Sequence, residues 1–184
     1  HTSGLRDWGS LMGIAGWPRG TRAYTHPHVL EIIARQRALN YAPGEQYSYT
    51  NSGYNLLAML VERVSGQSFA AFTKARIFDP LAMTRTSWRD DFRRVVPGRA
   101  QAYQPSQAGF RLDMPFENVH GNGGLLTTVG DLLRWNEALA KRTLGGASGG
   151  ALVDSLQRQG ILTSGERITY AAGLVVDEYR GTPR

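Results

Sequence analysis

The stretch Tyr47-Ser48-Tyr49-Thr50-Asn51-Ser52-Gly53-Tyr54 decides how this chain is interpreted. It runs into residues 51–64, where leucine and valine side chains recur at helical spacing. Tyr49 is therefore expected beside the N-terminus of a helix. A phenol in that position can act as a base, because the positive end of the helix dipole favours its deprotonated form. The amide of Asn51 can donate to a carbonyl and accept from an ammonium group.

The same two residues also have a purely structural explanation. Tyr49 can be a packed aromatic side chain, and Asn51 can be the N-cap of the helix, a position that asparagine favours strongly. The structural and catalytic roles are compatible, because a capping asparagine can also face a cleft. A base needs a nucleophile to deprotonate, and the sequence shows none. Ser3 is not a convincing one, because it lacks the Gly-x-Ser-x-Gly surroundings of a nucleophile elbow.

The composition is that of a globular domain. The chain has 184 residues, of which 41% are hydrophobic, and no apolar run approaches the ~20 residues of a membrane-spanning helix. It has no cysteine, which excludes disulfides and thiolate chemistry. The net charge is +6, but all basic residues except Lys74 and Lys141 are arginines scattered along the chain. Nucleic-acid-binding proteins more often cluster basic residues, so no nucleic-acid partner is expected.

Helices dominate the expected secondary structure. They are predicted at residues 26–38, 51–64, 68–78, 128–139 and 151–159, with a short hairpin between residues 99 and 114. Residues 168–179 are rich in β-branched and aromatic side chains and predict a strand. Because a lone strand has no partner for its backbone hydrogen bonds, the partner strands are expected outside this chain. We therefore expect a single partial domain, mostly helical over residues 1–165, with a strand of a truncated sheet in residues 166–184.

No metal or other cofactor is expected. His26-Pro27-His28 places two histidines close together in the sequence, but side chains two positions apart on a helix diverge. No third ligand is indicated, so these histidines are interpreted as surface residues.

Ordered sequence blocks carry a family resemblance. They are residues 1–5, 43–57, 64–68, 77–86 and 123–132. In these blocks the chain resembles the serine β-lactamase-like family, which joins class C β-lactamases, D-alanyl-D-alanine carboxypeptidases and related esterases. The resemblance implies a mainly α chain with minor β: the helical domain of a serine β-lactamase/transpeptidase-like α+β fold plus the beginning of its sheet.

The resemblance also implies three catalytic motifs: Ser-x-x-Lys, Tyr-x-Asn and a late Lys/His-x-Gly. Tyr49-Thr50-Asn51 matches the second motif, so the resemblance makes Tyr49 the general base and Asn51 a substrate-binding residue. Asn122 and Gly123, in a glycine-rich stretch near the family's cleft, are further substrate-binding candidates. The other two motifs do not occur in these residues, so the chain is expected to be an internal fragment.

The leading hypothesis is a fragment of a serine hydrolase that forms an acyl-serine with a β-lactam, a D-Ala-D-Ala peptide or an ester. The fragment itself is expected to be inactive, because a site without its nucleophile retains little more than binding. The alternative is a non-catalytic binding or assembly module on the same scaffold, and nucleic-acid binding is a third hypothesis that rests only on charge. We expect a small-molecule or peptidoglycan-like substrate, self-association through an exposed sheet edge, and a periplasmic or secreted intact protein.

Overall fold

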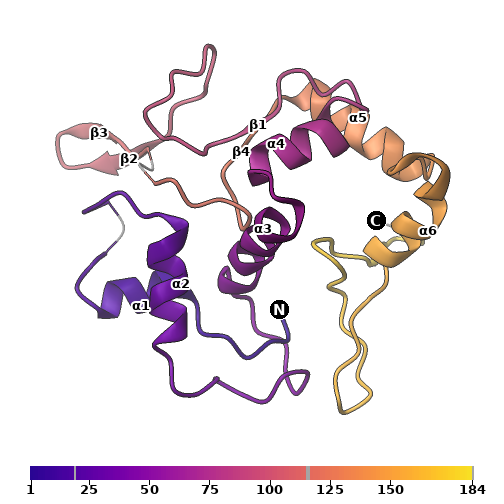
Figure 1. Cartoon of the computed structure of the whole chain (residues 1–184), viewed down its shortest axis with the longest axis horizontal. Helices are drawn as coiled ribbons and strands as arrows, with labels where there is room; N and C mark the ends of the chain where they lie inside the picture. The colour runs from indigo at the N-terminus through magenta and orange to yellow at the C-terminus, as the bar shows by residue number, and fades with distance from the viewer. Residues whose placement is uncertain (19, 115–116, 184) are drawn as a thin grey trace.

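The computed structural model describes residues 1–18, 20–114 and 117–183 (Figure 1). Its helices are α1 (Trp8–Ile14), α2 (His26–Ala34), α3 (Ser52–Ser65), α4 (Phe69–Thr73), α5 (Val129–Ala140) and α6 (Gly149–Leu156). A π-helical turn, Lys74–Phe78, continues α4, and a 3-10 turn, Gly146–Ser148, precedes α6. The strands are β1 (Ser87–Trp88), β2 (Tyr103–Ser106), β3 (Gly109–Leu112), β4 (Leu125–Leu126), β5 (Glu178–Tyr179) and β6 (Thr182–Pro183). The expected fold class, mainly α with minor β, is confirmed.

The central helix α3 follows the sequence closely at its ends. It stops where Gly66 adopts the left-handed conformation with φ 69°, as a glycine after an apolar run predicts. Its buried positions are small or polar, namely Ser52, Asn55 and Ala58, whereas Leu57 is exposed. The expected apolar stripe is therefore largely on the surface. With 14 residues α3 is the longest helix described, and no helix in the described part of the chain could cross a membrane.

The apolar core is divided between two clusters. The larger one packs α1, α2 and the loop before β4 together; its buried members are Trp8, Met12, Tyr24, Val29, Ile33 and Val119. The smaller one joins α5 to α6 through Ala138, Leu144 and Val153. Figure 1 shows α1 and α2 on one side of the molecule, α5 and α6 on the other, and α3 between them.

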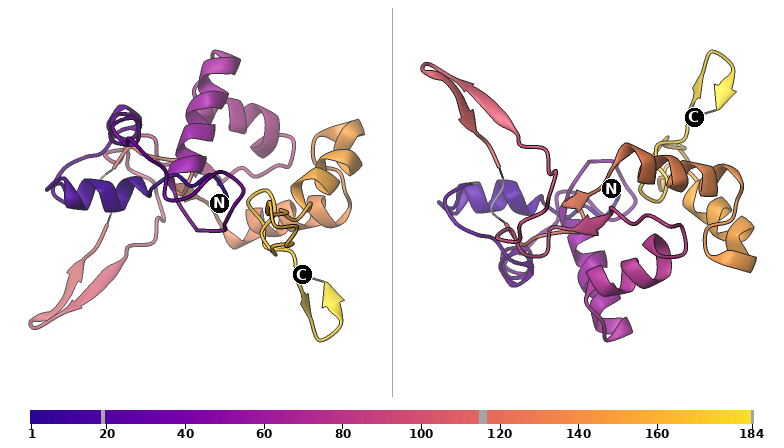
Figure 2. Two further views of the ribbon diagram at one scale, coloured as in Figure 1. Left: turned by 90° about the horizontal axis from the view of Figure 1, so that it is seen from below. Right: turned by 90° about the horizontal axis from the view of Figure 1, so that it is seen from above.

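All strand pairs are antiparallel: β1 with β4, β2 with β3, and β5 with β6. The hairpin β2–β3 lies in the range where the sequence predicts one, and Figure 2 shows it projecting from the body of the molecule. The short pair β1–β4 joins the chain after the π-helical turn to the segment that leads into α5.

The end of the chain corrects one expectation. Residues 168–179 do not form a single strand, because the chain reverses around Gly173, which adopts φ 84°. The Ala171 N–H donates to the Leu174 carbonyl over 2.8 Å, and Tyr170 bridges Val175. A glycine without Cβ permits this left-handed turn despite the strand propensity of its neighbours. The segment also bonds to its own chain, since the Gly160 N–H donates to the Tyr170 carbonyl over 2.9 Å.

Candidate functional site

Several separate segments are joined by backbone hydrogen bonds below the N-terminus of α3. The Ser48 N–H donates to the His1 carbonyl over 2.9 Å, and the Gly44 N–H donates to the Thr2 carbonyl over 2.7 Å. On the other side, the Thr163 N–H donates to the Gly44 carbonyl over 2.9 Å. These bonds hold the loop that carries Tyr49 between the first residues of the chain and the segment after α6.

An aromatic cluster forms on this support. It consists of His1, Tyr47, Tyr49, Tyr54 and Tyr170. His1 is at its centre, with its ring centroid 4.2 Å from that of Tyr49 and 4.4 Å from that of Tyr170. The Thr50 N–H donates to His1 Nδ1 over 3.2 Å, which fixes the orientation of the imidazole. The Tyr170 hydroxyl donates to the Tyr54 hydroxyl over 3.2 Å and ties the late segment to α3.

Tyr49 is the most exposed phenol of this cluster, at 61% of its surface. It borders a hollow of about 280 Å³ together with Asp7 and Ser10. Burial raises the pKa of Tyr170, and its hydrogen bond with Tyr54 adds to this effect. Burial also raises the pKa of Tyr47, with smaller contributions from neighbouring phenols. Tyr47 and Tyr170 therefore remain neutral phenols at neutral pH and are poor candidates for a base.

Asn51 occupies the N-cap position of α3, but its side chain makes no capping hydrogen bond among the described residues. Instead, its backbone N–H and its side-chain Nδ2 both donate to Asp7 Oδ2, each over 2.8 Å. The other carboxylate oxygen of Asp7 caps α1, accepting from the Gly9 and Ser10 amides. The Asp7 carboxylate therefore caps α1 and orients Asn51. This corrects the expectation that the Asn51 side chain caps α3.

A second asparagine lies on the same cavity as Asn51. Asn122 borders a space of about 230 Å³ that Asn51 also lines. Asn122 is positioned by Asn55, whose Nδ2 donates to Asn122 Oδ1 and to the His120 carbonyl, each over 2.8 Å. Two hydrogen-bonded pairs thus support the cavity, Asp7 with Asn51 and Asn55 with Asn122. We call these four residues the amide network. The structure thus brings Asn51 and Asn122 together, while Tyr49 borders a neighbouring hollow.

The fourth expected residue, Gly123, belongs to the turn that presents Asn122. Its carbonyl accepts from the Gly121 N–H over 3.2 Å. Gly121 has φ 106°, and a Cβ there would lie 2.7 Å from Ala58 Cβ and 2.8 Å from the Tyr54 carbonyl oxygen. Only glycine can therefore let this loop approach α3 so closely.

A buried ion pair forms part of the cavity wall. Glu117 lines the cavity, and Arg89 Nη2 donates to its Oε1 over 2.9 Å. Arg89 Nε also donates to the Glu117 carbonyl over 3.2 Å. Because the guanidinium neutralises this carboxylate, the cavity offers amide and paired groups rather than a free charge. It is suited to uncharged polar groups such as a peptide bond.

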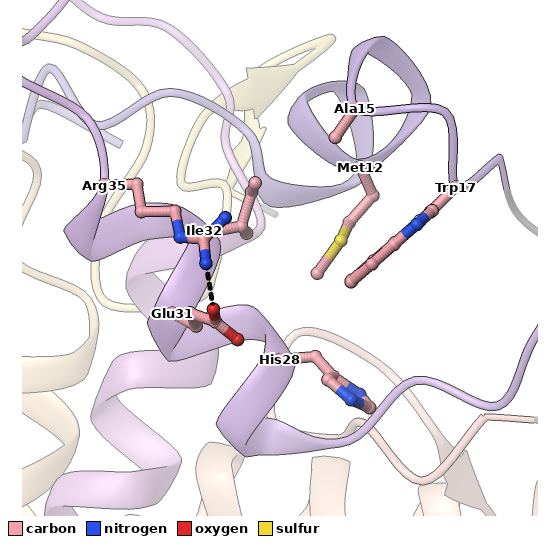
Figure 3. A pocket seen from close by; sticks show the side chains of 7 residues that line it. All are labelled: Met12, Ala15, Trp17, His28, Glu31, Ile32 and Arg35. Atoms are coloured by element: carbon pink, nitrogen blue, oxygen red, sulfur yellow. Dashed lines mark hydrogen bonds and ion pairs between the residues drawn. The ribbon is translucent and has the colours of Figure 1, made fainter.

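A smaller hollow of about 120 Å³ lies between α1 and α2 (Figure 3). Met12 and Trp17 lie side by side across it from Ile32, and Glu31 accepts a hydrogen bond from Arg35 at its rim. Its charged groups bind each other at the surface, and it contains none of the expected site residues. We assign it no part in the site.

Sequence reasoning missed two residues that organise the site, Asp7 and Asn55. Asn55 interrupts the apolar periodicity of α3, which was an available signal for a buried polar role. Asp7 directly precedes α1, a helix that the sequence did not predict, so its capping role was not visible.

The fold and the site together define a mainly helical part of an α+β protein with a Tyr-x-Asn element at a helix N-terminus. The sequence matches the Beta-lactamase family over residues 1–184, and the chain belongs to that family. It is 30% identical to penicillin-binding protein 4* of Bacillus subtilis, over 96% of this chain and 41% of that protein. It is 29% identical to a D-aminopeptidase of Brucella ovis, over 98% of this chain and 34% of that protein. The chain spans less than half the length of these relatives.

Solved structures share the fold. A D-stereospecific amidohydrolase from Streptomyces sp. superposes with a TM-score of 0.79 at 18% identity, over 98% of this chain and 55% of that chain. The octameric penicillin-binding protein homologue from Pyrococcus abyssi has a TM-score of 0.76 at 24% identity, over 100% of this chain and 43% of that chain. These matches confirm that the chain adopts part of the α+β fold of this family.

Proposed function

We propose that this chain is part of a serine hydrolase that acts by acyl transfer on D-amino acid amides or peptides. Family membership supports the reaction class, and the D-aminopeptidase relative supports this substrate class. The observation that carries the proposal is the amide network: Asp7 orients Asn51 toward a cavity that Asn122 shares, close to the exposed Tyr49.

In this proposal Tyr49 is the general base. The nucleophilic serine and its lysine are supplied by residues outside these 184, since no Ser-x-x-Lys occurs within them. Tyr49 takes the proton of the serine hydroxyl as its oxygen attacks the amide carbonyl carbon. The carbon–nitrogen bond then breaks, and the same proton passes from Tyr49 to the leaving nitrogen. Water hydrolyses the acyl-serine in the second half of the reaction.

Asn51 has hydrogen-bonding capacity for this task. Asp7 occupies one N–H of its carboxamide, which leaves a second N–H and the oxygen. The free N–H donates to the substrate carbonyl, and the oxygen accepts from the catalytic lysine. In Asn122 the oxygen is bound by Asn55, so its NH₂ group faces the substrate as a donor. The Gly123 carbonyl accepts from the Gly121 N–H in the turn that presents Asn122.

Three further properties belong to the same proposal. β-Lactams and esters undergo the same acyl transfer, so they are alternative substrates of the intact enzyme. The intact protein is periplasmic or secreted. It associates with itself through exposed strand edges such as β2–β3, a proposal that the printed description of the Pyrococcus abyssi homologue as octameric supports.

The test compares the 184-residue chain with the full-length gene product. We expect the chain alone to hydrolyse neither nitrocefin nor a D-alanine p-nitroanilide, and the full-length protein to hydrolyse the anilide with loss of turnover in Tyr49→Phe. Saturable turnover by the 184-residue chain that Tyr49→Phe abolishes would overturn the proposed inactivity. Binding without turnover in the full-length protein would favour the alternative, a non-catalytic module.

A further inference from the structure

Three side chains able to bind a metal converge away from the proposed catalytic residues. His26 is the first residue of α2, Glu62 lies in the C-terminal half of α3, and His120 lies in the loop before β4. One potential ligand atom of each lies within 4.8 Å of the others. His26 Nδ1 is 4.0 Å from Glu62 Oε2, and His120 Nε2 is 3.9 Å from Glu62 Oε1.

The imidazole of His120 is buried without a partner. Its residue is 6% exposed, and neither ring nitrogen has a hydrogen-bond partner among the described residues. Leaving a buried polar group unsatisfied destabilises a fold, so a ligand that uses one of these nitrogens would stabilise it. A neutral imidazole carries one unprotonated ring nitrogen, whose lone pair is free to bind such a ligand.

The surrounding contacts orient the other two side chains. His26 Nε2 lies 2.9 Å from the His120 carbonyl oxygen. The His120 N–H also lies within hydrogen-bond distance of Nε2, at 3.2 Å, so this nitrogen has a backbone partner in either tautomer. In the tautomer that donates from Nε2 to the carbonyl, Nδ1 is unprotonated and lies on the side of Glu62, where it can bind a metal. The Phe69 N–H donates to Glu62 Oε1 over 2.9 Å and fixes the carboxylate. Backbone contacts of this kind are typical supports of metal ligands.

We propose that His26 Nδ1, a Glu62 carboxylate oxygen and His120 Nε2 bind a divalent transition metal, zinc foremost. Two imidazoles and one carboxylate form a ligand set that zinc uses in proteins. Bonds of about 2.1 Å in tetrahedral geometry separate ligand atoms by about 3.4 Å. The present separations are at most 4.8 Å, so side-chain rotations that shorten them by up to about 1.4 Å complete the site. The Glu62 side chain is 33% exposed, which leaves a route for the ion and room for water as a fourth ligand.

The bound ion adds a further link between three elements: the start of α2, the end of α3 and the loop from His120 to Gly124. That loop presents Asn122 to the cavity. The metal is therefore a structural brace of the substrate-binding loop and takes no part in bond breaking. This proposal differs from the sequence-based expectation of no metal, which lacked the third ligand because His26 and His120 are 94 positions apart.

The experiment uses the tag-free full-length gene product, stripped with a chelator and titrated with zinc by calorimetry and by competition with a chromophoric chelator. We expect one zinc per chain that depends on these residues. Glu62→Gln and His26→Gln should each weaken binding by at least about tenfold. In a cobalt-substituted sample the visible absorption band should appear in the parent and be lost in Glu62→Gln.

The matched control is His28→Gln. His28 lies two residues from His26, but its ring bonds to Thr25 as part of a capping box, a role that glutamine also fills. This variant should bind zinc as the parent does. Glu62→Gln keeps an oxygen for the Phe69 N–H, so it decides the question if His26→Gln fails to fold. The proposal is overturned if the folded parent, checked by circular dichroism, binds no stoichiometric zinc, or if parent and Glu62→Gln bind it equally.

Discussion

The aromatic cluster and the amide network lie next to each other, yet they are built in opposite ways. Tyr49 is 61% exposed and is held mainly by ring contact with His1, whereas Asn55 is fully buried and donates to two separate loop groups. The proposed base is thus placed on the surface of a folded frame, while the amides that aim substrate groups are part of that frame. Substitution of Tyr49 in the aromatic cluster should therefore lower activity with little effect on stability, whereas substitution of Asn55 in the amide network should lower stability.

The largest expected effect is on activity and comes from the aromatic cluster. Tyr49→Phe in the full-length gene product should lower kcat by about 10²–10⁴-fold, because it removes the proposed proton carrier. Its free energy of unfolding should change by less than about 0.5 kcal/mol, since the side chain is exposed. Steady-state kinetics and urea unfolding measure the two quantities. Tyr47→Phe is the control and should retain activity; equal losses in both variants would contradict a specific role for Tyr49.

The next effect is on stability and comes from the amide network. Asn55→Ala leaves Asn122 Oδ1 without its donor and removes one of the bonds to the His120 carbonyl. We expect a loss of about 2–3 kcal/mol in the free energy of unfolding. The control is Asn136→Ala on the exposed face of α5, which should cost less than about 0.5 kcal/mol. Similar urea midpoints for the two variants would show that the network does not support the fold.

A smaller loss is expected where the binding loop touches α3. Gly121→Ala places a Cβ 2.7 Å from Ala58 Cβ at φ 106°, so loop or helix must shift. The expected cost is about 2 kcal/mol from overpacking and backbone strain. Gly123→Ala is the matched control, because a Cβ there meets no atom of the described residues within 4 Å. Thermal unfolding of both variants tests the comparison, and equal melting temperatures would disprove the tight approach.

The smallest effect tests a buried carboxylate outside both regions. Burial raises the pKa of Asp131, but hydrogen bonds from Thr86, Arg85 and Arg134 outweigh it and hold the pKa below its ordinary value of 3.8. As the pH falls, the unfolded state therefore binds a proton at Asp131 before the folded state does. The stabilisation contributed by the ionised Asp131 carboxylate is complete above pH 3.8 and is lost as the pH falls through the folded-state pKa.

Urea unfolding between neutral pH and pH 3 measures this dependence. Asp131→Asn should be less stable at neutral pH and should show a weaker decline in acid than the parent. A parallel decline in both proteins would assign the acid sensitivity to other carboxylates.

Much of the local structure could be predicted from the residues alone. Apolar periodicity located α3, and the helix predicted at residues 128–139 coincides with α5, which begins where the Asp131 N–H donates to Thr128 Oγ1. These features depend on neighbours in the chain, which the sequence displays directly. The strand expected at residues 168–179 was wrong, because a single left-handed glycine overrode the propensity of its neighbours.

The candidate site shows the same difference between features that depend on neighbouring residues and features that depend on distant ones. The family resemblance rested on five ordered sequence blocks, and the Tyr-x-Asn motif in one of them marked Tyr49 and Asn51. Such motifs are local information, because their residues are close together in the chain. The sharing of Asp7 between α1 and Asn51, and the buried support of Asn122 by Asn55, depend on segments that meet only after folding.

The sequence by itself therefore determined the family, the main helices and the residues proposed for the chemistry. Only the tertiary structure decided which side of α3 is buried and which carboxylate orients Asn51. It also brought the side chains of His26, Glu62 and His120 close together. The physical reason is that hydrogen bonds and packing across long sequence separations leave no periodic pattern in the chain. They exist only where the fold has brought distant side chains within bonding distance.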